Sequence, residues 1–453
     1  MVGTFDLENL GDVLFPLVAH HELSRRLVGL ELELFSYRSL DPPAWPFKVR
    51  PIASLTARLG EFDLLLVGGG HLIRGDAAVA PGYAPSDAVT SHPYGLWLIP
   101  TLLAEASGVP VVWNAVGALD SIEPTALPLV VAALKGVDYL AVRDLHAARF
   151  VRSLAATSSP VVVPDTVFAI GELLDAEAHR GAAAALADAG VEGAYVVVQP
   201  AGALLGHHGA VESIAAAAHA RGFRVVELAL GPCHDDVPGR LDLETPTARI
   251  EPWPAPLAAA AILAGAEAVV AASLHAGVIA LASGVPLHRP VAAEGAKHEI
   301  LDLLPGVRHL PADGDDREVD AAFGRAATSS QVVVHLAALA HHWDEVARHA
   351  TGRALRGPRP GIAELLGALP EILAAPERTS REALARLTAS HEVERWRDAA
   401  SRAALAEQLA IQRDRVAHLE SLLARRSVRV ALQLDALRER LRRIPRDAGP
   451  DAK

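Results

Sequence analysis

The sequence predicts an α/β protein with two doubly wound domains that face each other across a cleft, followed by a helical extension. Short apolar runs alternate with helical stretches in two successive sets, a pattern typical of doubly wound sheets. Runs such as 62–67 are apolar almost throughout, as strands of a parallel sheet are. At 453 residues the chain exceeds one ordinary core. We expect domains over 1–175 and 176–355, and the extension over 356–453.

The first set of elements begins with a turn at residues 9–12 and a helix through about 13–27. Strands are expected at 62–67, within 109–117 and at 139–142, and a helix follows at 145–154. Residues 161–168 are the last segment of this half. An Ala-rich helix over about 173–190 contains the expected junction between the two domains.

The second set of elements begins after that junction. Strands are expected at 194–199, 223–228 and 268–271, and helices at 211–221 and 257–264. A further helix begins near Ala276 and ends at Gly284, since Pro286 prevents its continuation. Residues 286–290 form a short strand or turn.

Composition limits the class of protein. The net charge of −12 argues against a general nucleic-acid binder, and the single cysteine excludes an internal disulfide framework and a Cys-based zinc site. Neither a secretory signal nor an apolar run of membrane-spanning length is expected. These features predict a cytoplasmic protein, with peripheral contact at the inner face of the membrane as an open alternative.

The extension is rich in Ala, Leu, Arg and Glu. Apolar residues recur from Leu405 to Ile444 at intervals of four and three, which favours a coiled coil or docking helix over 378–446. Eight arginines lie between 425 and 446 against two acidic residues, so this end could bind an anionic membrane surface. Self-association and a simple solvated helix remain alternatives.

His275 is the first candidate for chemistry, because it lies between a strand end and a helix start. Ligands of open parallel sheets bind at the carboxyl ends of the strands. Amide groups in the first helical turn attract an anion, and an imidazole exchanges protons near neutral pH. A role in capping the helix or filling a gap remains the alternative.

Other candidates also follow predicted strands or begin helices. Asn9 and Asp12 are residue types that cap helices, and a routine cap is their alternative role. The three glycines at 68–70 permit close approach of a ligand, but no Walker loop follows them. Arg143 could bind a carboxylate or phosphate through two hydrogen bonds, or form a surface pair with Asp144. His71 and Arg74 could reach an anion or be solvated loop residues.

Taken together, the chain resembles the polysaccharide pyruvyl transferase family over about residues 5–305. The resemblance rests on short motifs at 9–12, 68–70, 142–144 and 273–277, with the glycine and proline of 284–286 behind the last of them. Residues 163–166 and 295–298 add weaker support. The sequence departs from the family pattern at two positions. Ser273 stands where many members carry arginine, and Ala276 separates His275 from Gly277, whereas in the family glycine more often follows the histidine directly.

The resemblance implies two Rossmann-like domains arranged as in the GT-B glycosyltransferases. It also implies transfer of a pyruvyl group from phosphoenolpyruvate to sugar hydroxyls, as a ketal on a cell-envelope polysaccharide or exopolysaccharide, or on its lipid-linked precursor. Phosphoenolpyruvate would be a donor substrate, so no cofactor is expected. No metal is expected either, because His20-His21 and His207-His208 are adjacent pairs and the sequence shows no helical His-x-x-x-His with a carboxylate at ligand spacing. The partners would be this donor and a saccharide or lipid-linked oligosaccharide acceptor.

The resemblance also assigns roles to residues. His275 would act as general acid and base, Arg143 would bind the donor's carboxylate or phosphate, and Lys297 would neutralise the departing phosphate. Substrate contacts would come from Asn9, Gly11, Asp12, Gly68, Gly69, Gly70, Ser273 and Leu274.

Two other functions remain open. A GT-B glycosyltransferase would use a nucleotide sugar, and Glu294 is a weak candidate for its ribose-binding acid. A non-catalytic assembly protein would act through its helical extension, and Ser273 in place of arginine favours that reading.

Overall fold

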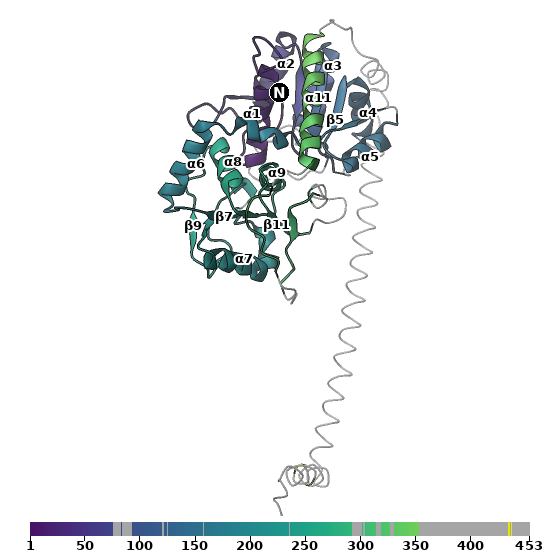
Figure 1. Cartoon of the computed structure of the whole chain (residues 1–453). Helices are drawn as coiled ribbons and strands as arrows, with labels where there is room; N and C mark the ends of the chain where they lie inside the picture. Colours follow the sequence, from purple (N-terminus) through teal and green to yellow (C-terminus); the bar gives the residue numbers. More distant parts are fainter. Residues whose placement is uncertain are drawn as a thin grey trace, which may run out of the picture. The chain divides into compact units, whose positions relative to one another are not determined.

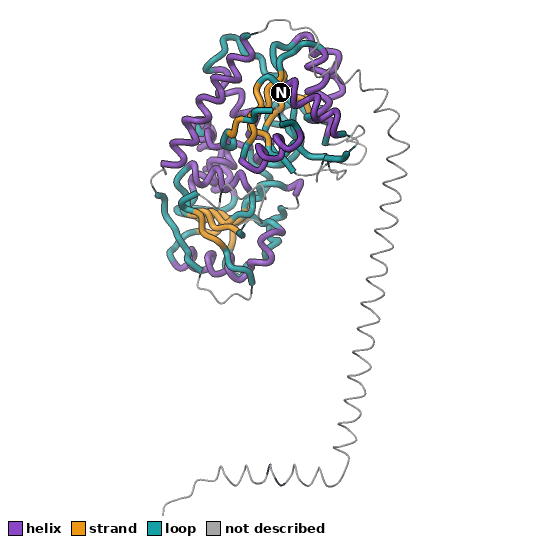
Figure 2. Tube along the Cα trace, turned by 90° about the vertical axis from the view of Figure 1, so that its right-hand side faces the viewer, coloured by secondary structure: helices purple, strands orange, loops and turns teal. Residues whose placement is uncertain are grey.

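The computed structural model describes residues 1–75, 83, 93–119, 122–124, 126–156, 158–234, 236–291, 301, 304–313, 319–326, 330–352, 434 and 436. Both large sheets lie within Met1–Pro370, which forms one compact unit (Figures 1 and 2). The predicted coiled coil and its arginine-rich end fall outside the described residues, apart from two positions, Leu434 and Ala436.

The amino-terminal half is built on a parallel sheet. Its strands follow one another in chain order: β3 (Leu65–Gly68), β4 (Val111–Val116), β5 (Tyr139–Val142) and β6 (Val161–Val162). Val2 forms parallel bridges to β3 and to β1 (Leu34–Ser36), which pairs with β2 (Val49–Pro51). After Val2 the chain first forms β1 and β2 on one side of it and then β3 to β6 on the other side. The strand order therefore reverses between Val2 and β3, which makes a topological switch point there.

The carboxyl-terminal half has a six-stranded parallel sheet in the order β12-β11-β10-β7-β8-β9. The strands are β7 (Tyr195–Val198), β8 (Arg224–Glu227), β9 (Thr247–Arg249), β10 (Ala268–Val270), β11 (Leu287–Arg289) and β12 (Val307–His309). The order reverses between β7 and β10, so this half also has a switch point at which a ligand is expected.

Helices flank both sheets. The α-helices are α1 (Leu10–Ser24), α2 (Leu55–Arg58), α3 (Leu98–Ala106), α4 (Leu127–Gly136), α5 (Leu145–Leu154), α6 (Ala176–Asp188), α7 (His208–Ala220), α8 (Pro256–Gly265), α9 (Leu274–Ala282) and α11 (Ser330–Thr351). The 3-10 helices are η1 (Ile52–Ser54), η2 (Leu59–Glu61), η3 (Tyr94–Leu96), η4 (Thr166–Leu173), η5 (Gly202–His207) and η6 (Pro232–His234). The doubly wound, GT-B-like architecture expected from the sequence is confirmed.

Local sequence explains where several helices begin and end. The Asp144 carboxylate accepts a 2.7 Å hydrogen bond from the Ala147 amide and so caps α5, whose bounds match the prediction. Pro256 opens α8, where its missing N–H costs nothing. Gly284 follows α9 with a φ of +71°, a backbone conformation that favours glycine.

One hydrophobic core joins the two halves. Helix α1 and η4 of the amino-terminal half pack against α8 and α9 of the carboxyl-terminal half. Phe15 and Phe168 from the first half share a cluster of buried side chains with Ile262 and Ile279 from the second. Burial of this apolar area holds the two halves together.

Helix α11 packs against the amino-terminal half, although it follows the carboxyl-terminal half in the chain (Figure 1). His342 is fully buried there, with Nε2 2.7 Å from Asn114 Oδ1 and Nδ1 3.2 Å from the Tyr139 hydroxyl. Trp343 is buried beside it. The predicted domain boundaries stay a prediction, but residues 330–351 contact the sheet of the other half, which sequence proximity did not indicate.

The buried His342 makes stability depend on pH. Burial, together with the charges of His341 and Arg26, lowers the pKa of His342 from 6.5 to about 3. Between pH 3 and 6.5 the unfolded chain therefore binds the extra proton, and the folded state loses about 1.4 kcal/mol for each pH unit of acidification. We expect the free energy of unfolding to fall by about 2 kcal/mol more between pH 7 and pH 5 in the native chain than in His342→Gln.

Urea unfolding at the two pH values measures this difference, since groups common to both proteins cancel. Equal pH dependence of the native chain and His342→Gln would show that α11 is released before His342 is protonated.

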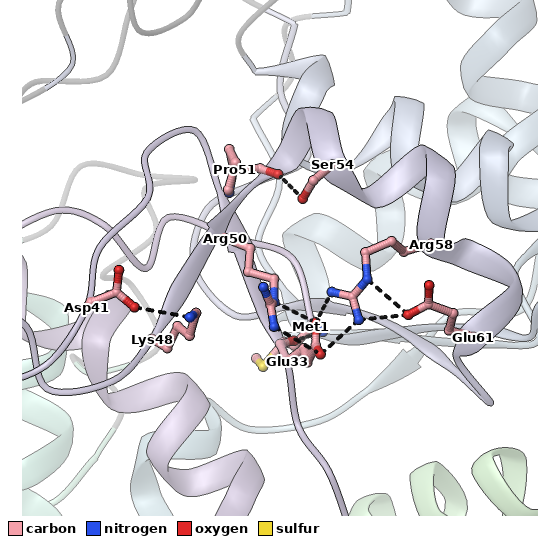
Figure 3. A network of polar contacts seen from close by, with 9 residues as sticks. All are labelled: Met1, Glu33, Asp41, Lys48, Arg50, Pro51, Ser54, Arg58 and Glu61. Atoms are coloured by element: carbon pink, nitrogen blue, oxygen red, sulfur yellow. Dashed lines mark hydrogen bonds and ion pairs between the residues drawn. The ribbon is translucent and has the colours of Figure 1, made fainter.

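A polar network fixes the edge of the amino-terminal half (Figure 3). The Glu33 carboxylate, just before β1, bonds Arg50 of β2 at 2.8 Å and Arg58 of α2 at 3.0 Å. Arg58 also bonds Glu61 at 2.8 Å. The hydrogen bond from Arg58 and the charges of both arginines lower the pKa of Glu33. The network ties β1, β2 and α2 together, away from the candidate site described next.

Candidate active site

A cavity of about 420 Å³ lies where the carboxyl ends of the two sheets meet. Gly70 and Arg143 line it from the ends of β3 and β5, and Gln199 and Ser273 line it from the ends of β7 and β10. Thr4 follows Val2 along the same wall. Both topological switch points therefore open onto one cavity, which is where ligands bind in sheets of this kind.

His275 lies in the first turn of α9, rather than before the helix as predicted. Ser273 occupies the N-cap and its hydroxyl accepts the Ala276 amide at 3.5 Å, so the capping role belongs to Ser273. The imidazole is 9% exposed and lines the cavity, and Phe15 packs edge-on against it with ring centroids 5.2 Å apart. The ring is thus held by packing and reaches the cavity.

Gly11 of α1, in the amino-terminal half, lies directly against this ring. A Cβ atom built on Gly11 would lie 1.8 Å from His275 Nδ1, so only a glycine at this point of α1 leaves room for the imidazole. Gly11 was predicted as a substrate contact, and the structure places it behind His275, outside the cavity lining of the described residues.

Arg143 is buried at the end of β5, with 1% exposure. Its Nη1 lies 3.5 Å from Asp165 Oδ2 and its Nε lies 3.8 Å from Asp144 Oδ2. Within the described residues Nε and Nη2 have no hydrogen-bond partner. Burial rules out the solvated surface pair with Asp144, and buried donors without partners are costly unless a ligand satisfies them.

Asp165 completes a buried group with Arg143 and His275. Its Oδ2 lies 3.4 Å from His275 Nε2, and its Oδ1 accepts the Val167 amide at 3.0 Å. Burial alone would raise the pKa of Asp165, but His275 and Arg143 outweigh it and hold this pKa below its usual range. The carboxylate is therefore ionised at neutral pH. The motif at 163–166 supports the family resemblance, but its pattern assigned no role to Asp165.

Asn9 and Asp12 form part of the amino-terminal wall. Asn9 stands at the N-cap of α1, but its side chain makes no capping hydrogen bond. Its Nδ2 instead donates to Asp12 Oδ2 at 3.0 Å and lies 3.2 Å from His234 Nε2 of the other half. A routine cap is therefore wrong for Asn9, and the pair links the two walls of the cavity.

The three glycines at 68–70 differ in role. A Cβ on Gly68 would lie 2.4 Å from Met1 Cε, and one on Gly69 would lie 2.2 Å from the Phe15 ring. Gly69 and Gly70 also have φ values of +71° and +76°. Close packing explains the first two, and Gly70 alone of the three is among the residues that line the cavity.

Gln199 organises the opposite wall. Its Oε1 accepts the amides of Ala272 and Ser273 at 3.0 and 2.9 Å, and its Nε2 donates to Asp236 Oδ2 at 2.7 Å. Burial raises the pKa of Asp236. Neither residue was among the candidates predicted from the sequence. Gln199 directly follows β7, and the same kind of position after β5 identified Arg143.

The cavity is rich in groups that can carry positive charge. Besides His275 and Arg143, its lining includes His71, Arg74, His234 and Arg240. His71 and Arg74 were predicted either to reach an anion or to be solvated loop residues, and the structure places both in the cavity lining. Leu274 also lines the cavity. Lys297 and Glu294 lie outside the described residues.

His21, Glu22 and Glu172 bring possible metal ligands within 4.8 Å of one another, away from this cavity. Arg26 pairs with Glu22 at 2.6 Å, and Arg25 pairs with Glu172. These arginines already neutralise the two carboxylates, so the cluster does not have the charge that a divalent cation requires.

Within the described part of the chain, no helix is both long enough and apolar enough to cross a bilayer. A comparison with curated proteins finds no significant match.

Two solved structures with a similar course of the chain are an epimerase and a heptosyltransferase. The UDP-GlcNAc 2-epimerase of Methanocaldococcus jannaschii is 12% identical, with 71% of this chain and 96% of that chain covered and a TM-score of 0.43. The E. coli ADP-heptose lps heptosyltransferase II is 11% identical, with 74% and 96% covered and a TM-score of 0.36.

A protein-family model gives the specific assignment. The model for polysaccharide pyruvyl transferase matches residues 9–288, which include Asn9, Arg143, Asp165 and His275. The match covers more than half of the chain and both walls of the cavity. The chain therefore belongs to the polysaccharide pyruvyl transferase family.

Proposed function

We propose that this protein transfers a pyruvyl group from phosphoenolpyruvate to two hydroxyls of a saccharide and leaves it there as a cyclic ketal. The observation that carries the proposal is the buried guanidinium of Arg143, whose Nε and Nη2 have no hydrogen-bond partner among the described residues, in the same cavity as the imidazole of His275. This arrangement suits a small anion that must also exchange a proton.

Phosphoenolpyruvate matches the charge of the cavity. The molecule carries a carboxylate and a phosphate, and the lining supplies arginines and histidines from both halves. Arg143 would bind one anionic group through its Nε and Nη2, which have no hydrogen-bond partner within the described part of the chain. The N-terminus of α9 lies beside it at Ser273 and adds the partial positive charge of a helix start.

The reaction needs two additions at one carbon. An acceptor hydroxyl adds to C2 of phosphoenolpyruvate and loses its proton, while C3 gains a proton and becomes a methyl group. A second hydroxyl then displaces inorganic phosphate from C2, loses its own proton and closes the ketal. His275 would deliver and accept these protons, and the cavity's arginines would stabilise the departing phosphate.

The acceptor would be a cell-envelope polysaccharide or exopolysaccharide unit, or its lipid-linked precursor, on the cytoplasmic side of the membrane. Family membership supports a polysaccharide acceptor. The arginine-rich end of the sequence would bring the protein to the membrane surface where a lipid-linked precursor is located.

Donor binding tests the proposal without knowledge of the acceptor. We expect calorimetry to show saturable binding of phosphoenolpyruvate but not of UDP-GlcNAc or ADP-heptose. Arg143→Lys keeps the charge but loses the two-pronged contact, and we expect it to raise the Kd about tenfold or more. Arg149→Lys, on the exposed face of α5, is the matched control and should leave the Kd unchanged.

Binding of a nucleotide sugar in place of phosphoenolpyruvate would assign the protein to sugar transfer. Equal affinities in Arg143→Lys and the native chain would remove Arg143 from the donor site.

A further inference from the structure

We propose that Asp165 is a positioning residue shared between Arg143 and His275, and that binding of the anionic donor at Arg143 leaves this carboxylate to His275. The inference rests on the proposed function and adds a coupling between donor binding and the charge of the acid–base group. It assigns a role to Asp165, a buried carboxylate in contact with Arg143 and His275.

The contacts of Asp165 suit a group that can change partners. One oxygen, Oδ1, is fixed by the Val167 amide at 3.0 Å. The other, Oδ2, faces two cationic partners at once, 3.5 Å from Arg143 Nη1 and 3.4 Å from His275 Nε2. Both distances are at the long limit for hydrogen bonds, so either contact can shorten when the other is relieved.

The site joins the two halves of the molecule. Asp165 and Arg143 belong to the amino-terminal half, and His275 belongs to α9 of the carboxyl-terminal half. Because all three side chains are at most 11% exposed, little water screens the charges between them. A charge added at Arg143 is therefore felt at His275.

Donor binding supplies such a charge. In the free protein Asp165 Oδ2 is shared between Arg143 and His275. A carboxylate or phosphate bound to Arg143 Nε and Nη2, which have no hydrogen-bond partner among the described residues, offsets the charge of Arg143. Asp165 is then left to pair with His275 at the step in which C3 of phosphoenolpyruvate needs an acid.

Other charged groups also lie around His275, but they are not the carboxylate shared with Arg143. Asp12 from α1 and His234 and Asp236 from the loop after β8 line the same cavity, and β11 brings His288 and Arg289 against α9. Asp236 is already engaged by Gln199 and by two backbone amides, and His288 Nε2 is 3.0 Å from the Ala322 carbonyl. Asp165 is the carboxylate in direct contact with the ring.

The test is proton uptake on donor binding, measured by calorimetry with phosphoenolpyruvate at pH 7.5 in buffers of different ionisation enthalpy. We expect uptake of up to about one proton per donor bound, because one imidazole titrates. Uptake should vanish in His275→Gln and fall by at least half in Asp165→Asn, which keeps an oxygen for the Val167 amide. The pH profile of kcat for Asp165→Asn, which reports the donor complex, should shift to lower pH.

Asp175→Asn is the matched control, because Asp175 also caps a helical segment but is exposed and remote from His275. It should keep native proton uptake. Donor binding without buffer-dependent heat in the native chain would overturn the coupling and leave the proposed function intact, whereas absence of donor binding would overturn both. Unchanged uptake in Asp165→Asn, with native melting temperature, would assign Asp165 a merely structural role.

Discussion

Replacement of His275 by glutamine is expected to lower kcat by about two to four orders of magnitude, the usual contribution of a positioned acid–base group. Glutamine fills a similar volume and keeps α9 capped, because the cap is the hydroxyl of Ser273. The melting temperature should therefore change little. The measurement is the rate of phosphate release from phosphoenolpyruvate with acceptor extracted from the native host.

His219→Gln provides the control, since this histidine lies on the exposed face of α7. It should retain the native rate. If His275→Gln also retained it, the imidazole would be a packing residue between Phe15 and Gly11, and the proton would have to come from another group.

Gly11→Ala is the second change with a large expected effect, and it tests the packing between the two halves. In an open helix the change would stabilise the protein by about 1 kcal/mol. Here the new methyl group would lie 1.8 Å from His275 Nδ1, so the ring or the helix must move. Overpacking of this kind costs about 1–3 kcal/mol, and displacement of a catalytic group by about 1 Å can cost about 10²-fold in rate.

We therefore expect Gly11→Ala to lower both the free energy of unfolding and kcat. Gly171→Ala in η4 is the control, because a Cβ there meets no atom within 4 Å. Urea unfolding and phosphate release measure the two effects. A Gly11→Ala protein that is more stable than the native chain and equally active would show that α1 does not lie against His275.

The local sequence was sufficient to predict the doubly wound architecture. Apolar runs identified β3, β5, β7 and β10, and the bounds of α5 matched the prediction. The short strands β1, β2 and β9 each contain a polar or charged residue, so no continuous apolar run marks them. The contact of α11 with β5 depends on long-range packing of His342 and Trp343, which local pattern does not contain.

For the site, the rule that functional residues follow parallel strands placed Arg143, Ser273 and His275 in the cavity lining. The same rule could have found Gln199. It could not find the sharing of Asp165 or the packing of Gly11 on His275, because these contacts join segments from different halves of the chain. Only the folded molecule defines those distances.

The continuous core beneath the cavity has a consequence for how the protein exchanges its ligands. In hinged two-domain proteins each domain has its own hydrophobic core, so opening exposes little apolar surface. Here α1 and η4 pack against α8 and α9, and the imidazole of His275 lies at this interface between the two halves. A wide hinge motion would therefore expose apolar side chains and separate His275 from both Asp165 and Gly11. Ligand exchange at lower cost would leave this interface closed.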